Sequence, residues 1–178
     1  NELYFGMMLV KMGMADGLVS GACHSTGDVL RPALQILKTS PDAQMVSSFF
    51  IMNVPDCELG HNGTFLFSDC GLEVQPDAER LAQIALNAQN AWNSLIDDVD
   101  PVVAMLSHST YSSAKNDDSN KVIEATRIVK ELAPDMAVDG ELQLDAAIIP
   151  EIGSAKAPDS AVAGKANVLV FPDIDAGN

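Results

Sequence analysis

Apolar and polar residues alternate along this chain with the spacing of helices in some segments and of strands in others. The clearest helical pattern covers residues 77–96, where Asp77 is the expected N-cap and apolar residues recur at three- and four-residue steps. That apolar stripe consists of Leu81, Ile84, Ala85, Ala88, Trp92 and Leu95. Weaker patterns of the same kind predict helices over 3–12, 26–37, 119–132 and 142–149.

Short apolar runs rich in β-forming residues predict strands between these helices. They lie at 17–22, 45–54, 64–70, 102–106 and 168–171. The polar link that contains Asn62-Gly63 predicts that the second and third runs pair as a hairpin. Alternating strands and helices indicate an α/β fold, which we expect to be a layered α/β/α domain with a mixed sheet over residues 1–178. Residues 154–165 have the most loop-like composition.

Composition and charge narrow the classes of function. The chain has 178 residues and a net charge of −15, which disfavours binding to nucleic acid and to anionic membranes because both require clustered Lys and Arg. No apolar run is long enough for a transmembrane helix, and the first residues lack the basic leader of a secretory signal. Three widely spaced cysteines argue against a disulfide framework and for a reducing, cytoplasmic location. Cys57, His61 and Cys70 do not have zinc-ligand spacing, so no metal site is expected there.

The first candidate site is the segment 21–28 followed by Arg31, between a predicted strand and a predicted helix. Free N–H groups at a helix start attract oxyanions, the hydroxyls of Ser25 and Thr26 add donors, and Arg31 carries a planar fork that matches phosphate. His24 lies in the same loop. Pattern alone favours a plainer interpretation, in which Thr26 caps the helix and Arg31 is a surface residue paired with Asp28.

Two further polar clusters follow predicted elements. The hydroxyl-rich loop 107–113, which includes Ser107 and Ser109, comes after a buried strand, where α/β proteins bind ligands; it could contact phosphate or a pantetheine amide, although a solvated turn is the more common case. Asp139-Gly140-Glu141, with Gln143 and Asp145, could hold a metal or supply acid–base groups. The more common alternative is a turn followed by a capped helix.

Longer segments resemble the phosphate acetyltransferase (phosphotransacetylase) family, in the order of that family and across essentially the whole chain. The matching segments are LYFGMM (3–8), ADGLVSGA (15–22), HST (24–26), LRPALQI (30–36), VSSFF (46–50), VAMLS (103–107), KV (121–122), EAT (124–126), VDGELQ (138–143), KAP (156–158), VAG (162–164) and FPD (171–173).

This resemblance implies a reversible acetyl transfer between coenzyme A and inorganic phosphate. It also implies a homodimer of two-domain α/β subunits related to the isocitrate and isopropylmalate dehydrogenases, with acetyl-CoA, CoA, acetyl phosphate and phosphate as ligands and with no cofactor or metal in the chemical step. Arg31 takes the position of a phosphate-side arginine of the family, a catalytic role, and His24, Ser25 and Thr26 occupy the adjoining substrate loop.

The family's catalytic Ser-Arg pair and its basic aspartate are expected beyond Asn178, and a further substrate arginine is expected before Asn1. On this reading the chain is mainly the second domain of the enzyme and is inactive alone. Another helix is expected to begin near 171–178. A phosphate butyryltransferase, and a non-catalytic phosphotransacetylase-like domain of a larger protein such as a malic enzyme, stay open as alternatives.

Overall fold

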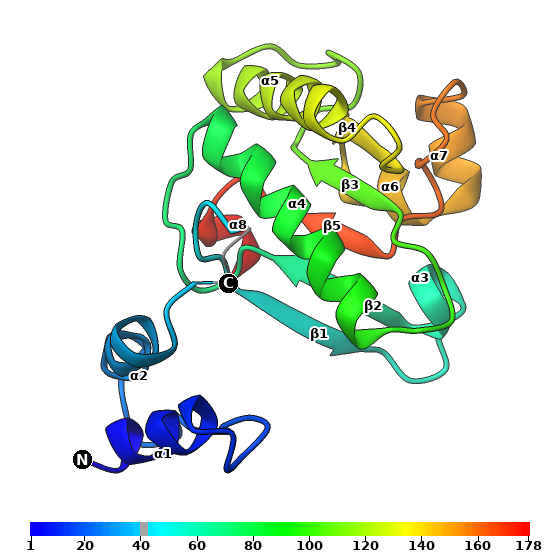
Figure 1. The fold of residues 1–178 in the computed structure, drawn as a ribbon. Helices are drawn as coiled ribbons and strands as arrows, with labels where there is room; N and C mark the ends of the chain where they lie inside the picture. The colour runs from blue at the N-terminus through cyan, green and yellow to red at the C-terminus, as the bar shows by residue number, and fades with distance from the viewer. Residues whose placement is uncertain (40–42) are drawn as a thin grey trace. The chain divides into compact units, whose positions relative to one another are not determined.

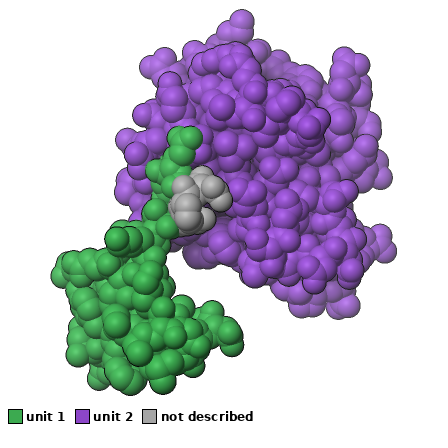
Figure 2. All heavy atoms as spheres, viewed as in Figure 1, with its two compact units in different colours: residues 1–46 green, residues 47–178 purple. Residues whose placement is uncertain are grey.

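The computed structural model describes residues 1–39 and 43–178. The chain divides into two compact units, Asn1–Val46 and Ser47–Asn178, coloured green and purple in Figure 2. The sheet of the α/β fold lies wholly within Ser47–Asn178. In the described ranges, no helix combines the length and the apolarity that crossing a bilayer requires.

Two short helical segments build the unit Asn1–Val46. Helix α1 spans Glu2–Lys11, and α2, Thr26–Pro32, continues into a π-helical turn, η1, at Ala33–Leu37. Both predicted helices are therefore confirmed. The change from α to π geometry begins directly after Pro32, whose ring and missing N–H disturb the regular ladder.

The strand predicted at residues 17–22 is wrong. This segment has no regular secondary structure, and no strand in the described part of the chain pairs with it. Val19 is fully exposed, with a relative accessibility of 102%. A strand needs a neighbouring backbone as well as suitable side chains, and local sequence reports only the second requirement.

The described residues of Ser47–Asn178 form a five-stranded mixed sheet (Figure 1). Its strands are β1 (Phe49–Asn53), β2 (Thr64–Ser68), β3 (Val103–Leu106), β4 (Val138–Leu142) and β5 (Val168–Val170). The order across the sheet is β1-β2-β5-β3-β4; β1 is antiparallel to β2, and every other neighbouring pair is parallel. The predicted hairpin is confirmed, with Phe49 opposite Ser68 and Asn53 opposite Thr64.

Helices and loops cover both faces of this sheet, as the predicted layered fold requires, except at β1, whose five residues are all exposed. The helices are α3 (Leu59–Asn62), α4 (Ala78–Leu95), α5 (Asp117–Leu132), α6 (Leu144–Ile148), α7 (Pro150–Lys156) and α8 (Ile174–Gly177). Helices α4 and α5 lie side by side over one face (Figure 1). A buried cluster that includes Ala104, Leu169, Ala147 and Ala157 joins the sheet to the segment that carries α6 and α7. Helix α8 begins where a further helix was expected.

Helix α4 forms closely where the sequence predicts it. The Asp77 carboxylate accepts the N–H of Arg80 at 2.9 Å and so caps the helix start. The predicted apolar stripe is buried from Leu81 to Trp92, but Leu95, in the last turn, is 54% exposed. Helix α5 begins two residues before the predicted start, at a capping box formed by Asn116 and Ser119.

The region after α5 differs from the prediction. Residues 138–142 form strand β4 at one edge of the sheet, so Asp139-Gly140-Glu141 is neither a turn nor a helix cap. The predicted helix 142–149 is shortened to α6, and the first residues of the predicted loop 154–165 belong to α7. Asp and Gly disfavour strands, which is why the local composition concealed this one.

Candidate functional site

Ser25 caps the start of α2. Its hydroxyl donates to Oδ2 of Asp28 at 2.8 Å, and its oxygen accepts the N–H of Asp28 at 3.2 Å. The cap is therefore Ser25 and not Thr26. The hydrogen bond from Ser25, together with the nearby charges of Arg31 and His24, lowers the pKa of the Asp28 carboxyl.

Arg31 differs from the other two arginines of the chain in its surroundings. The guanidinium of Arg80 holds Glu73 through two hydrogen bonds, and that of Arg127 pairs with two glutamates of α5. Among the described residues, Arg31 is exposed and forms no ion pair, including with Asp28. His24, Ser25 and Thr26 are exposed as well. The segment thus presents a permanently charged fork and several donors to solvent, which is a combination suited to an oxyanion.

The loop after β3 uses its serines in two different ways. Ser109 is fully buried; its hydroxyl donates to Oε1 of Glu141 at 2.8 Å and accepts the N–H of Ala114 at 3.0 Å. Ser107 is half-buried, and its hydroxyl oxygen accepts the N–H of Ser109 at 3.2 Å. His108 is exposed. The hydroxyl of Ser109 is thus engaged inside the protein, whereas Ser107 and His108 lie where a ligand can reach them.

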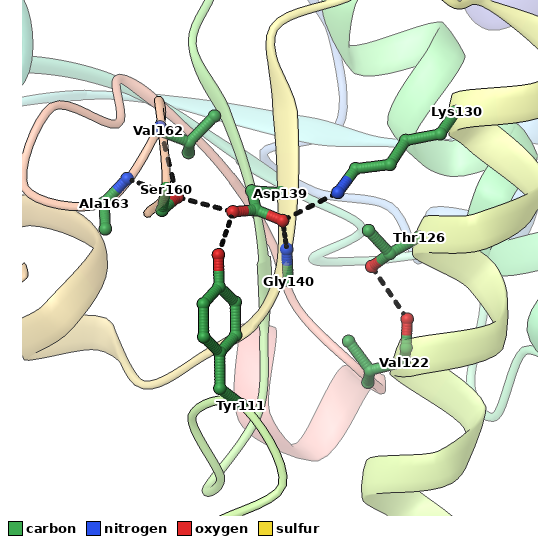
Figure 3. Close-up of polar contacts among 9 residues, drawn as sticks. All are labelled: Tyr111, Val122, Thr126, Lys130, Asp139, Gly140, Ser160, Val162 and Ala163. Atoms are coloured by element: carbon green, nitrogen blue, oxygen red, sulfur yellow. Dashed lines mark hydrogen bonds and ion pairs between the residues drawn. The ribbon is translucent and has the colours of Figure 1, made fainter. Parts of the chain in front are cut away.

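Asp139 is the centre of a polar group that we call the Asp139 cluster: Asp139, Tyr111, Lys130 and Ser160 (Figure 3). Its Oδ1 accepts from Nζ of Lys130 at 2.8 Å and from the N–H of Gly140 at 3.0 Å. Its Oδ2 accepts from the hydroxyls of Tyr111 at 2.6 Å and Ser160 at 2.5 Å. The cluster therefore ties β4 to α5 and to two loops.

These contacts change the acidity of both partners. Burial raises the pKa of the Asp139 carboxyl, but the hydrogen bonds from Lys130, Ser160 and Tyr111 outweigh burial and leave that pKa below its usual value. Burial, followed by the hydrogen bond to Asp139, raises the pKa of the Tyr111 phenol to about 12. At neutral pH the carboxylate is ionised and the phenol holds its proton.

An open hollow of about 310 Å³ adjoins the Asp139 cluster. It is lined by Tyr111, Lys130, Met136, Ala137, Val138, Asp139, Asp159, Ala161 and Val162. The metal alternative for the carboxylates near Asp139 finds no support, because the described residues contain no group of three or more His, Cys, Asp or Glu that could hold a metal ion. Asp145 instead pairs with Lys156 at 2.8 Å.

The predicted site residues fall in separate units. His24, Ser25, Thr26 and Arg31 belong to Asn1–Val46, while Ser107 and Ser109 belong to Ser47–Asn178. In the first unit His24 precedes α2, Ser25 caps it, and Thr26 and Arg31 lie within it, whereas Ser107 and Ser109 share the loop after β3. Sequence reasoning missed Tyr111, Lys130 and Ser160 as partners of Asp139. They come from elements 9 to 28 residues away from it, so no local signal marks them.

Comparison with known proteins assigns the family. The sequence pattern described as phosphate acetyl/butaryl transferase matches residues 1–178. The phosphate acetyltransferase of Acetivibrio thermocellus is 59% identical over 178 residues, which are 100% of this chain and 53% of that protein. The crystal structure of a phosphotransacetylase from Streptococcus pyogenes superposes with a TM-score of 0.84 and 52% identity, over 98% of this chain and 51% of that one.

A solved structure with lower sequence identity to this chain is described as a branched-chain enzyme. The branched-chain phosphotransacylase of Enterococcus faecalis V583 has a TM-score of 0.75 and 26% identity, over 99% of this chain and 61% of that one. The chain thus spans about half the length of the curated relatives it matches. From the match over its whole length and the shared mixed α/β fold, the chain belongs to the phosphate acetyl/butaryl transferase family.

Proposed function

We propose that this chain is part of an enzyme that transfers an acetyl group reversibly between coenzyme A and inorganic phosphate. In the forward direction a phosphate oxygen attacks the thioester carbonyl of acetyl-CoA. A C–O bond forms, the C–S bond breaks, and acetyl phosphate and the CoA thiolate leave. The identity of 59% to a named phosphate acetyltransferase over the entire chain is the observation that carries this proposal.

Within this reaction Arg31 is proposed to bind phosphate. Its exposed guanidinium has no carboxylate partner among the described residues, so it need not break an ion pair to receive an anion. His24 and Thr26 would add hydrogen bonds at the start of α2, and Ser25 would do so by turning its hydroxyl from Asp28 toward the anion. A bidentate arginine also orients the attacking oxygen, and positioning of this kind accounts for a large part of catalysis with two substrates.

Within the unit Ser47–Asn178, Ser107 is proposed as a phosphate contact, because it lies after the carboxyl end of β3 and is partly exposed. Ser109 was also predicted from the sequence to contact phosphate. It is buried, and its hydroxyl donates to Glu141 instead. The reaction needs no metal or cofactor in this proposal, and coenzyme A enters as a substrate. A homodimer and a cytoplasmic location remain part of the same proposal.

Acetyl is favoured over a larger acyl group by similarity. Identity is 52% to the structure described as a phosphotransacetylase and 26% to the one described as a branched-chain phosphotransacylase. The test is the rate of CoA release from acetyl-CoA and from butyryl-CoA, with phosphate as acceptor, by the full-length protein. A higher kcat/KM for acetyl-CoA is expected, and a higher value for butyryl-CoA would overturn the acetyl assignment.

The same assay separates an enzyme from a non-catalytic domain. Full-length protein that releases no CoA above the phosphate-free control would favour a binding or regulatory role. Residues 1–178 alone are expected to be inactive, since general base catalysis alone typically contributes about 10²- to 10⁴-fold and the family's catalytic residues are expected elsewhere. Turnover by this segment near that of the full-length protein would contradict the proposal that essential catalytic residues lie outside residues 1–178.

A further inference from the structure

Strand β4 holds the loop 107–113 through a series of contacts. The N–H of Ser107 donates to the carbonyl of Leu142 at 2.9 Å, and the N–H of Tyr111 donates to the carbonyl of Glu141 at 3.2 Å. Gln143, the residue directly after β4, donates its N–H to Oγ1 of Thr110 at 2.9 Å. The loop that carries the proposed phosphate contact Ser107 is therefore shaped by the strand beside it.

Glu141 makes the side-chain contacts at the centre of this series. Its Oε1 accepts the Ser109 hydroxyl at 2.8 Å and the N–H of Ser112 at 2.6 Å. The residue is 2% exposed, and in the described part of the chain no Lys or Arg forms an ion pair with it. A buried carboxylate is costly unless its hydrogen bonds are made, and the side-chain bonds of this one come from a single loop.

The backbone on both sides of this contact is unusual. Tyr111 and Ser112 have φ values of 47° and 64°, in the left-handed region that side-chain-bearing residues adopt at a cost. The hydrogen bond from Ser112 to Glu141 holds the second of them in place. On β4 itself the register shifts, so that Gly140 lies opposite Met105, Leu142 lies opposite Leu106, and Glu141 is the additional residue. A bulge of this kind redirects a side chain, here toward the loop.

We infer that Glu141 is a positioning residue for phosphate. By fixing Ser109 and Ser112, it sets the conformation of the loop 107–113 and therefore the direction in which Ser107 and His108 face at the carboxyl end of β3. This inference rests on the proposed function. It assigns to Glu141 the role of a hydrogen-bond acceptor, because both side-chain contacts end on one oxygen and neither involves a cation.

The test compares two substitutions of Glu141 in the full-length protein. Glu141→Gln keeps an acceptor oxygen, so KM for phosphate should stay within about twofold of wild type. Glu141→Ala removes it and should raise KM for phosphate about tenfold while kcat changes less than about threefold. The matched control is Glu131→Ala, which removes an exposed carboxylate of α5. All rates are measured well below the Tm of each variant.

A second substitution covers the case in which Glu141→Ala does not fold. Ser109→Ala removes one of the two donors and should raise KM for phosphate about threefold. The inference is overturned if these variants lower only Tm and leave KM unchanged, or if Glu141→Gln is as impaired as Glu141→Ala. Failure of the proposed function looks different, because wild-type protein would then form no acetyl phosphate.

Discussion

The ammonium group of Lys130 lies 2.8 Å from Oδ1 of Asp139, which ties the last turn of α5 to the edge strand β4. The lysine side chain is 52% exposed, whereas that of Asp139 is only 10% exposed. The two members of the ion pair therefore differ in their access to water. Water can replace the carboxylate as a partner of Lys130, but it cannot readily replace the four protein donors of Asp139.

Asp139→Asn should therefore destabilise the fold much more than Lys130→Met. The amide group of asparagine turns a donor toward the hydroxyls of Tyr111 and Ser160, which themselves donate. We expect a loss of about 3 kcal/mol for Asp139→Asn and about 1 kcal/mol or less for Lys130→Met, from urea denaturation at pH 7. Equal losses would show that the ion pair, and not the hydroxyl contacts, stabilises the cluster.

Acid should weaken the fold through the same carboxyl group. The pKa of Asp139 is lower in the folded protein than in the unfolded chain. Its contribution to the free energy of unfolding is therefore present above the unfolded pKa of about 3.9 and is lost as pH falls through the folded pKa. The difference in unfolding free energy between wild type and Asp139→Asn should thus shrink between pH 7 and pH 3. A difference that is constant over this range would contradict this assignment.

Tyr111 should respond at the opposite end of the pH scale. Its pKa is raised to about 12 in the folded protein. Its contribution to the free energy of unfolding is therefore complete below the unfolded pKa of about 10 and is lost as pH rises through about 12. The chain has two tyrosines, Tyr4 and Tyr111, which makes a titration of tyrosinate absorbance readable. The component near pH 12 should disappear in Tyr111→Phe and persist in Tyr4→Phe.

Arg31→Ala should reduce kcat/KM of the full-length protein about 100-fold, because a charged, two-pronged contact to phosphate is lost. Arg31→Lys should recover only part of this, since an ammonium group supplies charge without the planar fork. Arg127→Ala is the matched control, as that residue already pairs with Glu124 and Glu131 on α5. If Arg31→Ala and the control have the same activity, phosphate binds elsewhere.

The cysteines should differ in their reaction with iodoacetamide. All three are free thiols; Cys23 is exposed, and Cys70 is buried. Burial, with the charge of Asp69, raises the pKa of the Cys70 thiol to about 11, so little of its reactive thiolate exists at pH 8. Mass spectrometry of native protein should find Cys23 alkylated first and Cys70 last. In urea the order should vanish, since it depends on the fold.

Elements that depend on local pattern were predictable from the sequence. Helix α4 lies within a residue of the prediction at each end, because its apolar stripe repeats through several turns and Asp77 supplies a cap. Buried β3 and β5 were visible as apolar runs between polar segments. The hairpin also followed from nearby residues, since its two strands are consecutive and the link between them, residues 54–63, contains Asn62-Gly63.

Features that depend on distant partners were not predictable. The apolar residues of 17–22 resemble those of a strand, yet nothing local reports whether another strand lies beside them. Asp139 and Glu141 lie in a strand whose polar side chains both accept hydrogen bonds from a loop about 30 residues earlier. Ser109 illustrates the limit for the site: its position after β3 was clear, but the inward direction of its hydroxyl depends on Glu141.

The order of strands in the sheet also constrains how the protein folds. Strand β5 lies between β2 and β3, yet it comes after all the other strands in the chain. The sheet therefore has two halves, the hairpin of β1 and β2 and the parallel pair of β3 and β4. No backbone hydrogen bonds join these halves until Val168–Val170 pairs with both β2 and β3. Such closure by a late, central strand gives the chain a high contact order. During synthesis the two halves of the sheet would have unpaired inner strand edges until this segment is made, and unpaired strand edges favour aggregation.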